Sequence, residues 1–306
     1  MFVEQQFRPR DMDDRLTRRT FVCGVSTAVS TGLAGCSEDQ SGGGAVTPTR
    51  TDGTDSMATE PANGGDTDTT EAETGAYRNG VGQNASVSVA VPNDTAALTS
   101  PSVQWRATAD GVTIEEAGEV TSGAGHYHII VDADPVTPGE TIPTDDAHIH
   151  YGTGQKDGVL ELDPGEHTLH LQLGDGAHTA MALTDSVDVT VSDEASLSVE
   201  TSVDGSVVDW EASVENYTIG PTSDGITSNT GHLHAIVNTD PVPTGEVIPN
   251  DARHVHYGDG STSGSLDLAE QLGDAYEAGE HTVHFQIASA THRATTLTAS
   301  ETVTTE

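Results

Sequence analysis

The chain has 306 residues, with 49 Asp or Glu against 11 Lys or Arg, and a formal net charge of −38 at pH 7. Such an acidic surface repels nucleic acid and anionic lipid, so a nucleic-acid-binding function is excluded. Concentrated salt screens these charges over a few ångström, and the composition is typical of adaptation to very high salt. A calcium-binding acidic surface is the sharper alternative, but the chain has no D-x-[DN]-x-[DN]-G loop.

Residues 1–35 have the pattern of a twin-arginine export signal. Thr17-Arg18-Arg19-Thr20-Phe21-Val22 carries the paired arginines, and Leu33-Ala34-Gly35-Cys36 is similar to a lipoprotein cleavage box. The apolar run between them is too short and too rich in Ser, Thr and Gly to span a membrane. We therefore expect an exported protein, anchored to the outer face of the cell membrane by lipid on Cys36. A plain cleavable signal is the alternative.

Residues 36–80 are predicted to be a disordered tether. This segment is rich in Ser, Thr, Gly and Asp and has too few apolar residues to bury a core. Cys23 would leave with the signal and Cys36 would carry the lipid. No thiol then remains for a disulfide, a thiolate metal site or a nucleophile.

The remainder of the chain is an internal duplication, which divides it into residues 81–193 and 194–306. The matched segments include Gly125–Val131 with Gly231–Val237 and His148–Gly152 with His254–Gly258. The main departure is an insertion at Ala269–Tyr276 in the second copy. Similarity that extends well beyond histidine indicates a duplicated domain and not a composition bias.

Each repeat is predicted to be all-β, a small antiparallel β-sandwich of immunoglobulin-like type. Short runs with alternating apolar residues recur between Gly, Pro, Asp and Asn, which is typical of this architecture. In the first repeat the expected strands are Ala85–Val91, Ser102–Thr108, His126–Val131, Ala147–Tyr151, Gly158–Leu162, His167–Leu173 and Ser186–Val191. Trp105 and Trp210 are predicted core residues. Leu268–Glu277 is the one segment where a helix competes, and it is expected to be a surface excursion.

All 14 histidines fall in the repeats, seven in each, with nearly the same spacing. Each set has two His-x-His pairs, then Gly-Glu-His-Thr-x-His, then a last histidine eight positions on. The first set is His126, His128, His148, His150, His167, His170 and His178, and the second is His232, His234, His254, His256, His281, His284 and His292. Because histidine is the usual neutral metal ligand, function is sought in this pattern.

The alternation of a β-strand places both histidines of a His-x-His pair on one face, roughly 6 to 7 Å apart. If the two strands are neighbours, four imidazoles converge. An all-nitrogen cluster suits copper, zinc or nickel, and copper or zinc is the expected ion. The predicted ligands are His126, His128, His148 and His150 in the first repeat and His232, His234, His254 and His256 in the second.

The remaining histidines are assigned by their position on the next strand. In each repeat one shares its strand face with apolar residues, where a hydrogen-bonded structural role is the ordinary case, and one lies in the following turn, from which it could close a site. Both are possible additional ligands: His167 and His178 in the first repeat, His281 and His292 in the second. His170 and His284 lie on the opposite strand face with Gln172 and Gln286, and are expected to be exposed.

Two other interpretations of the histidines stay open. The imidazoles could hydrogen-bond one another, Tyr151 or the backbone, in which case the protein is a non-catalytic interaction or structural module at the cell surface. An enzyme is the remaining possibility, but we nominate no catalytic residue. No repeated serine accompanies histidine in a nucleophile pattern, and no Gly-rich phosphate loop leads from a strand into a helix.

The combination of Gly125-His126-x-His128, His148-Ile149-His150-Tyr151-Gly152 and Gly165-x-His167-Thr168 resembles the domain of unknown function DUF4399. The resemblance covers about Pro101–Met181 and, more weakly, Val208–Thr295. It implies tandem small exported β domains in a lipoprotein of haloarchaeal type, and it supplies no activity. The second copy departs from the motif, since Ser261 stands where the first has Gln155. If only one copy is active, we expect it to be the first.

Overall fold

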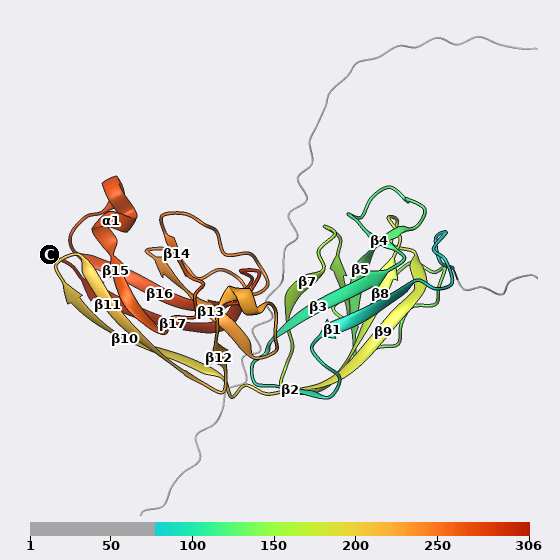
Figure 1. The fold of residues 1–306 in the computed structure, drawn as a ribbon, viewed down its shortest axis with the longest axis horizontal. Coiled ribbons are helices and arrows are strands. Elements are labelled where there is room, and N and C mark those ends of the chain that lie inside the picture. The colour runs from blue at the N-terminus through green and yellow to red at the C-terminus, as the bar shows by residue number, and fades with distance from the viewer. Residues whose placement is uncertain (1–76) are drawn as a thin grey trace, which may run out of the picture. The chain divides into compact units, whose positions relative to one another are not determined.

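A computed structural model describes residues 77–306, all of which belong to one compact unit of the chain. The expected export signal, the lipidation site Cys36 and nearly all of the expected tether lie outside the described residues. From Tyr77 onward the chain folds into two tandem β-sandwiches (Figure 1), so the predicted fold class is confirmed. Among these residues no helix has the length and apolar character needed to cross a membrane.

The first repeat pairs a three-stranded sheet with a six-stranded sheet. The smaller sheet has the order β1 (Ser86–Val91), β3 (Ser102–Asp110), β7 (Asp157–Glu161). The larger has the order β2 (Ala96–Leu98), β9 (Ala180–Val191), β8 (Gly165–Gly174), β5 (Ala124–Val131), β4 (Thr113–Ile114), with β6 (His148–Tyr151) also paired to β5. All seven expected strands are present, and the sequence pattern missed only the two- and three-residue strands β4 and β2.

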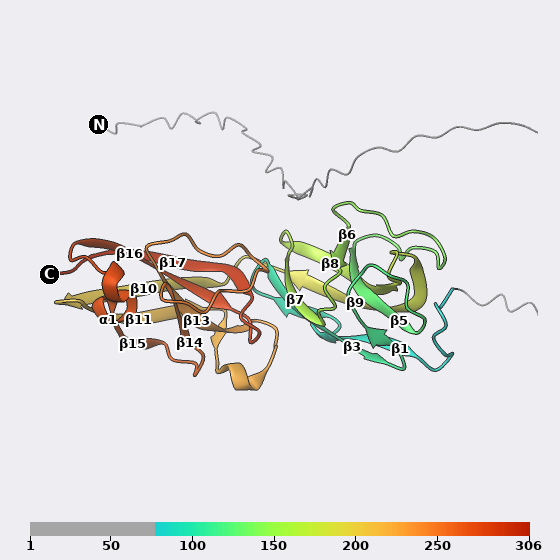
Figure 2. The ribbon, with the colours of Figure 1, turned by 90° about the horizontal axis from the view of Figure 1, so that it is seen from above.

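The second repeat has the same plan, which can be followed in Figure 2. Its smaller sheet is β10 (Ser196–Asp204), β11 (Val207–Glu215), β15 (Ser263–Asp267). Its larger sheet is β12 (Thr218–Ile219), β13 (Thr230–Val237), β16 (Glu280–Ala288), β17 (Ala294–Thr304), with β14 (His254–Tyr257) also paired to β13. The helical elements are η1 (Thr222–Asp224), α1 (Leu268–Leu272) and η2 (Gly273–Ala275).

The two tryptophans lie in the cores between the sheets, as predicted. Trp105 is 1% exposed, and its ring centroid lies 4.3 Å from that of Tyr151 and 6.3 Å from that of Tyr127. Trp210 packs in the same way against Tyr257 and Phe285. Aromatic clusters of this kind bury large apolar areas and fix the separation of the two sheets.

The insertion in the second repeat is helical, and it combines mostly exposed or partly buried residues with a buried leucine, Leu272. Asp267 caps the N-terminus of α1, because its carboxylate accepts hydrogen bonds from the backbone N–H groups of Ala269 and Glu270. Leu268 and Leu272, one turn apart, are both buried in the core of this repeat. The helix therefore supplies apolar side chains to the sandwich.

The larger sheet of each repeat is covered on its outer face by the connection between its two histidine-pair strands. Tyr127 and Ile129 of β5 point into the sandwich core, so His126 and His128 point the other way. Gln172 lies beside His128 on this outer face and hydrogen-bonds both the N–H and the carbonyl of Val136 in the connection. Gln172 is consequently buried, and His170 and His284 on the same strand faces are partly buried, which corrects the expectation that these two histidines are exposed.

Candidate metal centre

Four imidazoles converge on the covered outer face of each large sheet. Two come from the His-x-His pair of the central strand, one from the neighbouring strand, and one from the turn after the next strand. The groups are His126, His128, His150 and His178 in the first repeat and His232, His234, His256 and His292 in the second. The strand pairing sets this geometry, because His128 lies directly opposite His150 and His234 directly opposite His256.

Two pairs of imidazole nitrogens in each cluster have separations close to those of ligands that share one ion. The Nε2 atoms of His126 and His128 are 3.0 Å apart, and those of His150 and His178 are 3.2 Å apart. The corresponding distances in the second repeat are 2.9 Å and 3.2 Å. Four nitrogens bound tetrahedrally at a zinc–nitrogen distance of roughly 2.0 to 2.1 Å lie about 3.3 Å from one another. The nitrogens within each bonded pair are therefore about as far apart as two ligands of a four-coordinate ion.

The two sites differ slightly in how tightly the imidazoles gather. In the second repeat one nitrogen from each of the four histidines lies within 4.8 Å of all the others. In the first repeat this holds for His126, His150 and His178, with His128 bonded to His126 at the edge of that group. In both clusters the two histidines of the central strand are fully buried and form the inner pair. The other two form the rim pair, which is His150 and His178 in the first repeat and His256 and His292 in the second.

Burial keeps the inner imidazoles neutral. Burial, together with charge on the neighbouring imidazoles, lowers the pKa of His126 to about 4 and that of His128 to about 2. The same two causes lower the pKa of His232 to about 3 and that of His234 to about 2. Since a metal binds the deprotonated imidazole, these ligands are available at neutral pH without loss of a proton.

One ring nitrogen of each inner imidazole is unpaired. The Nδ1 atoms of His126, His128, His232 and His234 are all buried and find no hydrogen-bond partner among the described residues. In a neutral pair joined only by one bond between Nε2 atoms, an N–H and a lone pair both remain unused at Nδ1. A metal bound at the Nε2 atoms would also leave an unpaired Nδ1–H on each ring, so these atoms do not distinguish a structural role from a metal-binding role.

The turn histidine of each site has an unusual backbone conformation. His178 has a φ of +65° and His292 a φ of +62°, in the left-handed region that non-glycine residues rarely adopt. The carbonyl of His178 accepts a hydrogen bond from the N–H of Ile142, and that of His292 from the N–H of Ile248. Backbone strain of this kind concentrates at functional sites and persists where the surrounding structure enforces it.

A glycine in each repeat makes room for the rim imidazole. A Cβ atom on Gly152 would lie 2.2 Å from Cε1 of His150, and one on Gly258 would lie 2.2 Å from Cε1 of His256. Any residue with a Cβ atom in this position would force the ring to move. The signal was present in the sequence as the repeated His-x-His-Tyr-Gly motif, but its glycine was not recognised as part of the site.

The structure does not bring His148 and His254 into the clusters. Their Nδ1 atoms lie 2.7 Å and 2.8 Å from Oδ1 of Asp145 and Asp251, which also accept backbone N–H bonds in the same turn. His148 and His254 point from the same strand face as His150 and His256, as strand alternation predicted, but they do not reach the cluster. The fourth imidazole of each cluster comes instead from the turn: His178 lies beside His126, and His292 lies beside His232.

His167 and His281, the other possible additional ligands, lie apart from the clusters. His167 places Nδ1 2.7 Å from Oδ2 of Asp132 and Nε2 2.8 Å from the carbonyl oxygen of Asp163. His281 has the same arrangement, but Asn238 replaces the carboxylate and Glu277 provides the carbonyl. With both nitrogens engaged, these residues stabilise the start of β8 and β16.

The geometry defines a tandem β-sandwich with one four-histidine cluster in each repeat. A family model for a domain of unknown function, DUF4399, matches residues 105–192 and 211–306. These two matches cover more than half of the chain, which therefore belongs to the DUF4399 family and carries two copies of its domain. No curated protein matches the chain.

Solved structures that match the chain are similar only distantly. Fibronectin(III)-like modules of Clostridium thermocellum CbhA are 12% identical, with 72% of this chain and 94% of that chain covered and a TM-score of 0.25. A tetra-tandem repeat from the extending region of a large adhesion protein is 15% identical, with 72% of this chain and 49% of that chain covered and a TM-score of 0.24.

Proposed function

We propose that each repeat binds one transition-metal ion, copper or zinc, through four imidazoles. The ligands are His126, His128, His150 and His178 in the first repeat and His232, His234, His256 and His292 in the second. The observation that carries the proposal is the gathering of four imidazole rings in both repeats, with nitrogens 2.9 to 3.2 Å apart within the bonded pairs. Relative to the sequence prediction, the turn histidine replaces His148 and His254.

The composition of the cluster supports a borderline transition metal. All four ligands are neutral nitrogens, which suit copper and zinc and are poor ligands for calcium or magnesium. A bound ion would link two strands, β5 and β6 or β13 and β14, to the turn after β8 or β16, so its binding would stabilise the folded repeat. The buried inner pair would hold the ion, while the half-exposed rim pair would admit it from solvent.

Metal titration of the exported part of the chain, purified without a histidine tag and stripped with chelator, tests the proposal. Isothermal calorimetry with Zn²⁺ and Cu²⁺ should give two ions per chain, and the thermal midpoint should rise with each metal and stay unchanged with Mg²⁺. Binding no tighter than millimolar in both repeats would sink the proposal. That result would favour a surface module in which the histidines serve only the fold.

We also propose that the chain is exported and lipid-anchored through Cys36. The twin-arginine pattern and the Leu-Ala-Gly-Cys sequence support this location. Membrane fractionation of cells that express the full chain should recover it with the membranes, and Cys36→Ser should release it in soluble form. Recovery of the Cys36→Ser variant with the membranes would contradict lipid attachment at this residue.

A further inference from the structure

The turn that presents His292 in the second repeat is secured differently from its counterpart in the first. In the first repeat the carboxylate of Asp175 accepts hydrogen bonds from the backbone N–H groups of Ala177 and Thr179, on either side of His178. Tyr77 donates its hydroxyl to the other oxygen of the same carboxylate, at 2.6 Å. This turn therefore carries its own anionic acceptor.

The second turn has lost that carboxylate. Ser289 stands where the first repeat has Asp175, and within residues 77–306 its hydroxyl hydrogen-bonds only the Thr291 hydroxyl and the N–H of Arg293, both at 3.2 Å. A serine hydroxyl is a weaker acceptor than an ionised carboxylate, so it holds the turn less firmly. His292 nevertheless keeps a left-handed backbone, with a φ of +62° against +65° for His178.

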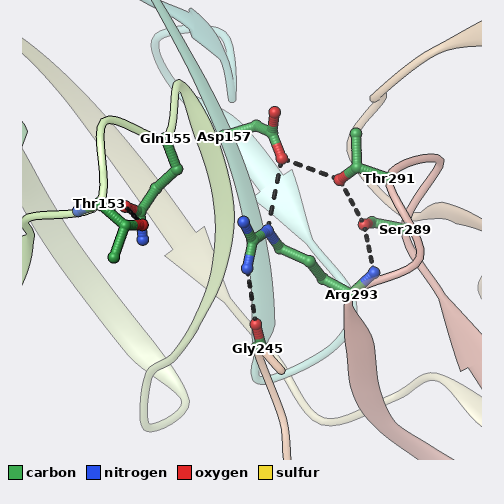
Figure 3. A network of polar contacts seen from close by, with 7 residues as sticks. All are labelled: Thr153, Gln155, Asp157, Gly245, Ser289, Thr291 and Arg293. Carbon is green, nitrogen blue, oxygen red and sulfur yellow. Dashed lines mark hydrogen bonds and ion pairs between the residues drawn. The ribbon is translucent and has the colours of Figure 1, made fainter. Parts of the chain in front are cut away.

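A carboxylate from the first repeat contacts the turn that presents His292. Figure 3 shows Asp157, the first residue of β7, with its Oδ1 atom between two side chains of the second turn. Thr291 donates its hydroxyl to this oxygen at 2.8 Å, and Nε of Arg293 lies 3.4 Å from it. Arg293 also donates to the carbonyl of Gly245, at 3.1 Å. These two side chains belong to the residues immediately before and after His292.

The sequences of the two turns fit this exchange. The residues that flank His178 are Ala177 and Thr179, and the residues that flank His292 are Thr291 and Arg293. Only the second turn has a side-chain hydrogen-bond donor on each side of its histidine, and both donors reach Asp157. The side chains of Asp157 and Arg293 are only 25% and 20% exposed, so solvent screens their attraction less than at an open surface.

We propose that Asp157 is a positioning residue for the metal site of the second repeat. Its carboxylate fixes Thr291 and Arg293 and thereby holds His292 in the orientation that the cluster needs. The first repeat thus completes a site that lies in the second. This inference rests on the proposed function, because it concerns the affinity of that same site.

The test uses the exported part of the chain in a background in which the first site is silenced by His150→Ala and His178→Ala. Zn²⁺ affinity is measured by calorimetry, and the visible d–d spectrum of bound Co²⁺ reports the coordination geometry. Asp157→Ala should weaken Zn²⁺ binding at the second site about tenfold, the range for residues that orient a ligand, and should change the Co²⁺ spectrum. Asp157→Asn keeps an acceptor oxygen and should retain most of the affinity.

Two further variants separate positioning from general loosening. Ser289→Asp, added to Asp157→Ala, gives the second turn the carboxylate that the first turn has, and should restore both affinity and spectrum. Ser102→Ala is the matched control, since it removes a different contact between the repeats, the hydrogen bonds of Ser102 to Thr296. It should leave Zn²⁺ affinity unchanged.

The outcomes distinguish the two proposals. If the background itself binds neither Zn²⁺ nor Co²⁺, the proposed function of the second repeat fails and this inference fails with it. If the background binds and Asp157→Ala binds equally well with the same spectrum, only the positioning role of Asp157 is overturned. The same holds if Ser102→Ala weakens binding as much as Asp157→Ala, or if Ser289→Asp restores nothing.

Discussion

The two repeats keep the same four-histidine geometry while the residues around it differ. The bonded imidazole pairs are separated by 3.0 and 3.2 Å in the first repeat and by 2.9 and 3.2 Å in the second. Outside the cluster, Asp175 is exchanged for Ser289 and Asp132 for Asn238. The comparison indicates that the four histidines are kept in both repeats, whereas the residues that hydrogen-bond the surrounding turns and strands can differ. Because all four imidazoles recur in the second repeat, the geometry gives no reason to favour the first copy.

The largest effect is expected when one rim ligand is removed from each repeat in turn, which tests whether the two repeats bind metal equally. His150→Ala should abolish one ion per chain and leave the second site intact, and His256→Ala should do the reverse. Loss of one of four ligands should weaken that site more than about 100-fold, beyond the range for outer-shell residues. Calorimetric stoichiometry with Zn²⁺ measures both effects.

His148→Ala is the control for this experiment. His148 shares its strand face with His150 but bonds Asp145 and lies outside the cluster, so the variant should still bind two ions. If His148→Ala instead removes one ion and His178→Ala removes none, the sequence prediction of the ligand set is right and the set proposed from the structure is wrong.

Acid should weaken both repeats of the metal-free protein. Burial lowers the pKa of His126, His128, His232 and His234 to about 4 or less, against 6.5 for a free imidazole. Between these values the unfolded chain binds more protons than the folded chain, so stability is present above pH 6.5 and is lost as pH falls toward the folded pKa. At pH 5 the loss is up to about 2 kcal/mol for each such imidazole.

Urea unfolding of the chelator-treated protein at pH 7.5 and pH 5, at one fixed salt concentration, measures this effect. Unperturbed carboxylates titrate below this window, so they contribute little to the difference. A urea midpoint that does not move between the two pH values would show that the inner imidazoles are not held neutral by burial.

Gly152→Ala should weaken the first site without removing a ligand. The added Cβ would lie 2.2 Å from Cε1 and 2.3 Å from Nε2 of His150, so the ring must leave its position. We expect about a tenfold loss of Zn²⁺ affinity at that site, as for other residues that orient a ligand. Gly258→Ala should have the same effect on the second site, because the same contact recurs with His256.

Gly82→Ala provides the matched control, since a Cβ at Gly82 meets nothing within 4 Å. It should leave the affinity of both sites and the urea midpoint unchanged. Equal binding by Gly152→Ala and Gly82→Ala would mean that the His150 ring is free to adopt another productive position.

Much of the fold could be predicted from the sequence, because it depends on alternation that is visible there. Apolar residues at every second position predicted the seven long strands of the first repeat, and the same parity predicted that His126 and His128 share a face. Convergence of the imidazoles required the strand of His126 and His128 to be the neighbour of the strand of His150, and the two strands are paired in the structure. These features need only local geometry.

The rest of the site depends on contacts between segments that no local pattern encodes. Whether His148 or His178 joins the cluster is decided by the hydrogen bond to Asp145 and by a left-handed residue in a turn. The burial of Gln172 depends on the connection between β5 and β6, which folds over the outer face and bonds it through Val136. A strand face that is solvated in an isolated sheet is covered here, so parity alone gives the wrong exposure.

The smallest expected difference between the repeats concerns the histidine outside each cluster. Burial opposes protonation of His167, but its hydrogen bonds to Asp132 and to the Asp163 carbonyl, together with their charges, raise its pKa overall. A raised folded pKa contributes stability that is present below pH 6.5 and is lost as pH rises through the folded value. Asn238 carries no charge in the corresponding place beside His281.

Asp132→Asn converts the first arrangement into the second. It should destabilise the protein at pH 6 by no more than about 1 kcal/mol, the usual range for an ion pair with one exposed partner, and by less at pH 9. Urea unfolding at the two pH values measures the difference, with Asp134→Asn as the control because Asp134 is an exposed carboxylate in the same connection. Since Asp132 also accepts the N–H of Thr168, a pH-independent loss would show that this backbone contact, and not a charged His167, is what the carboxylate stabilises.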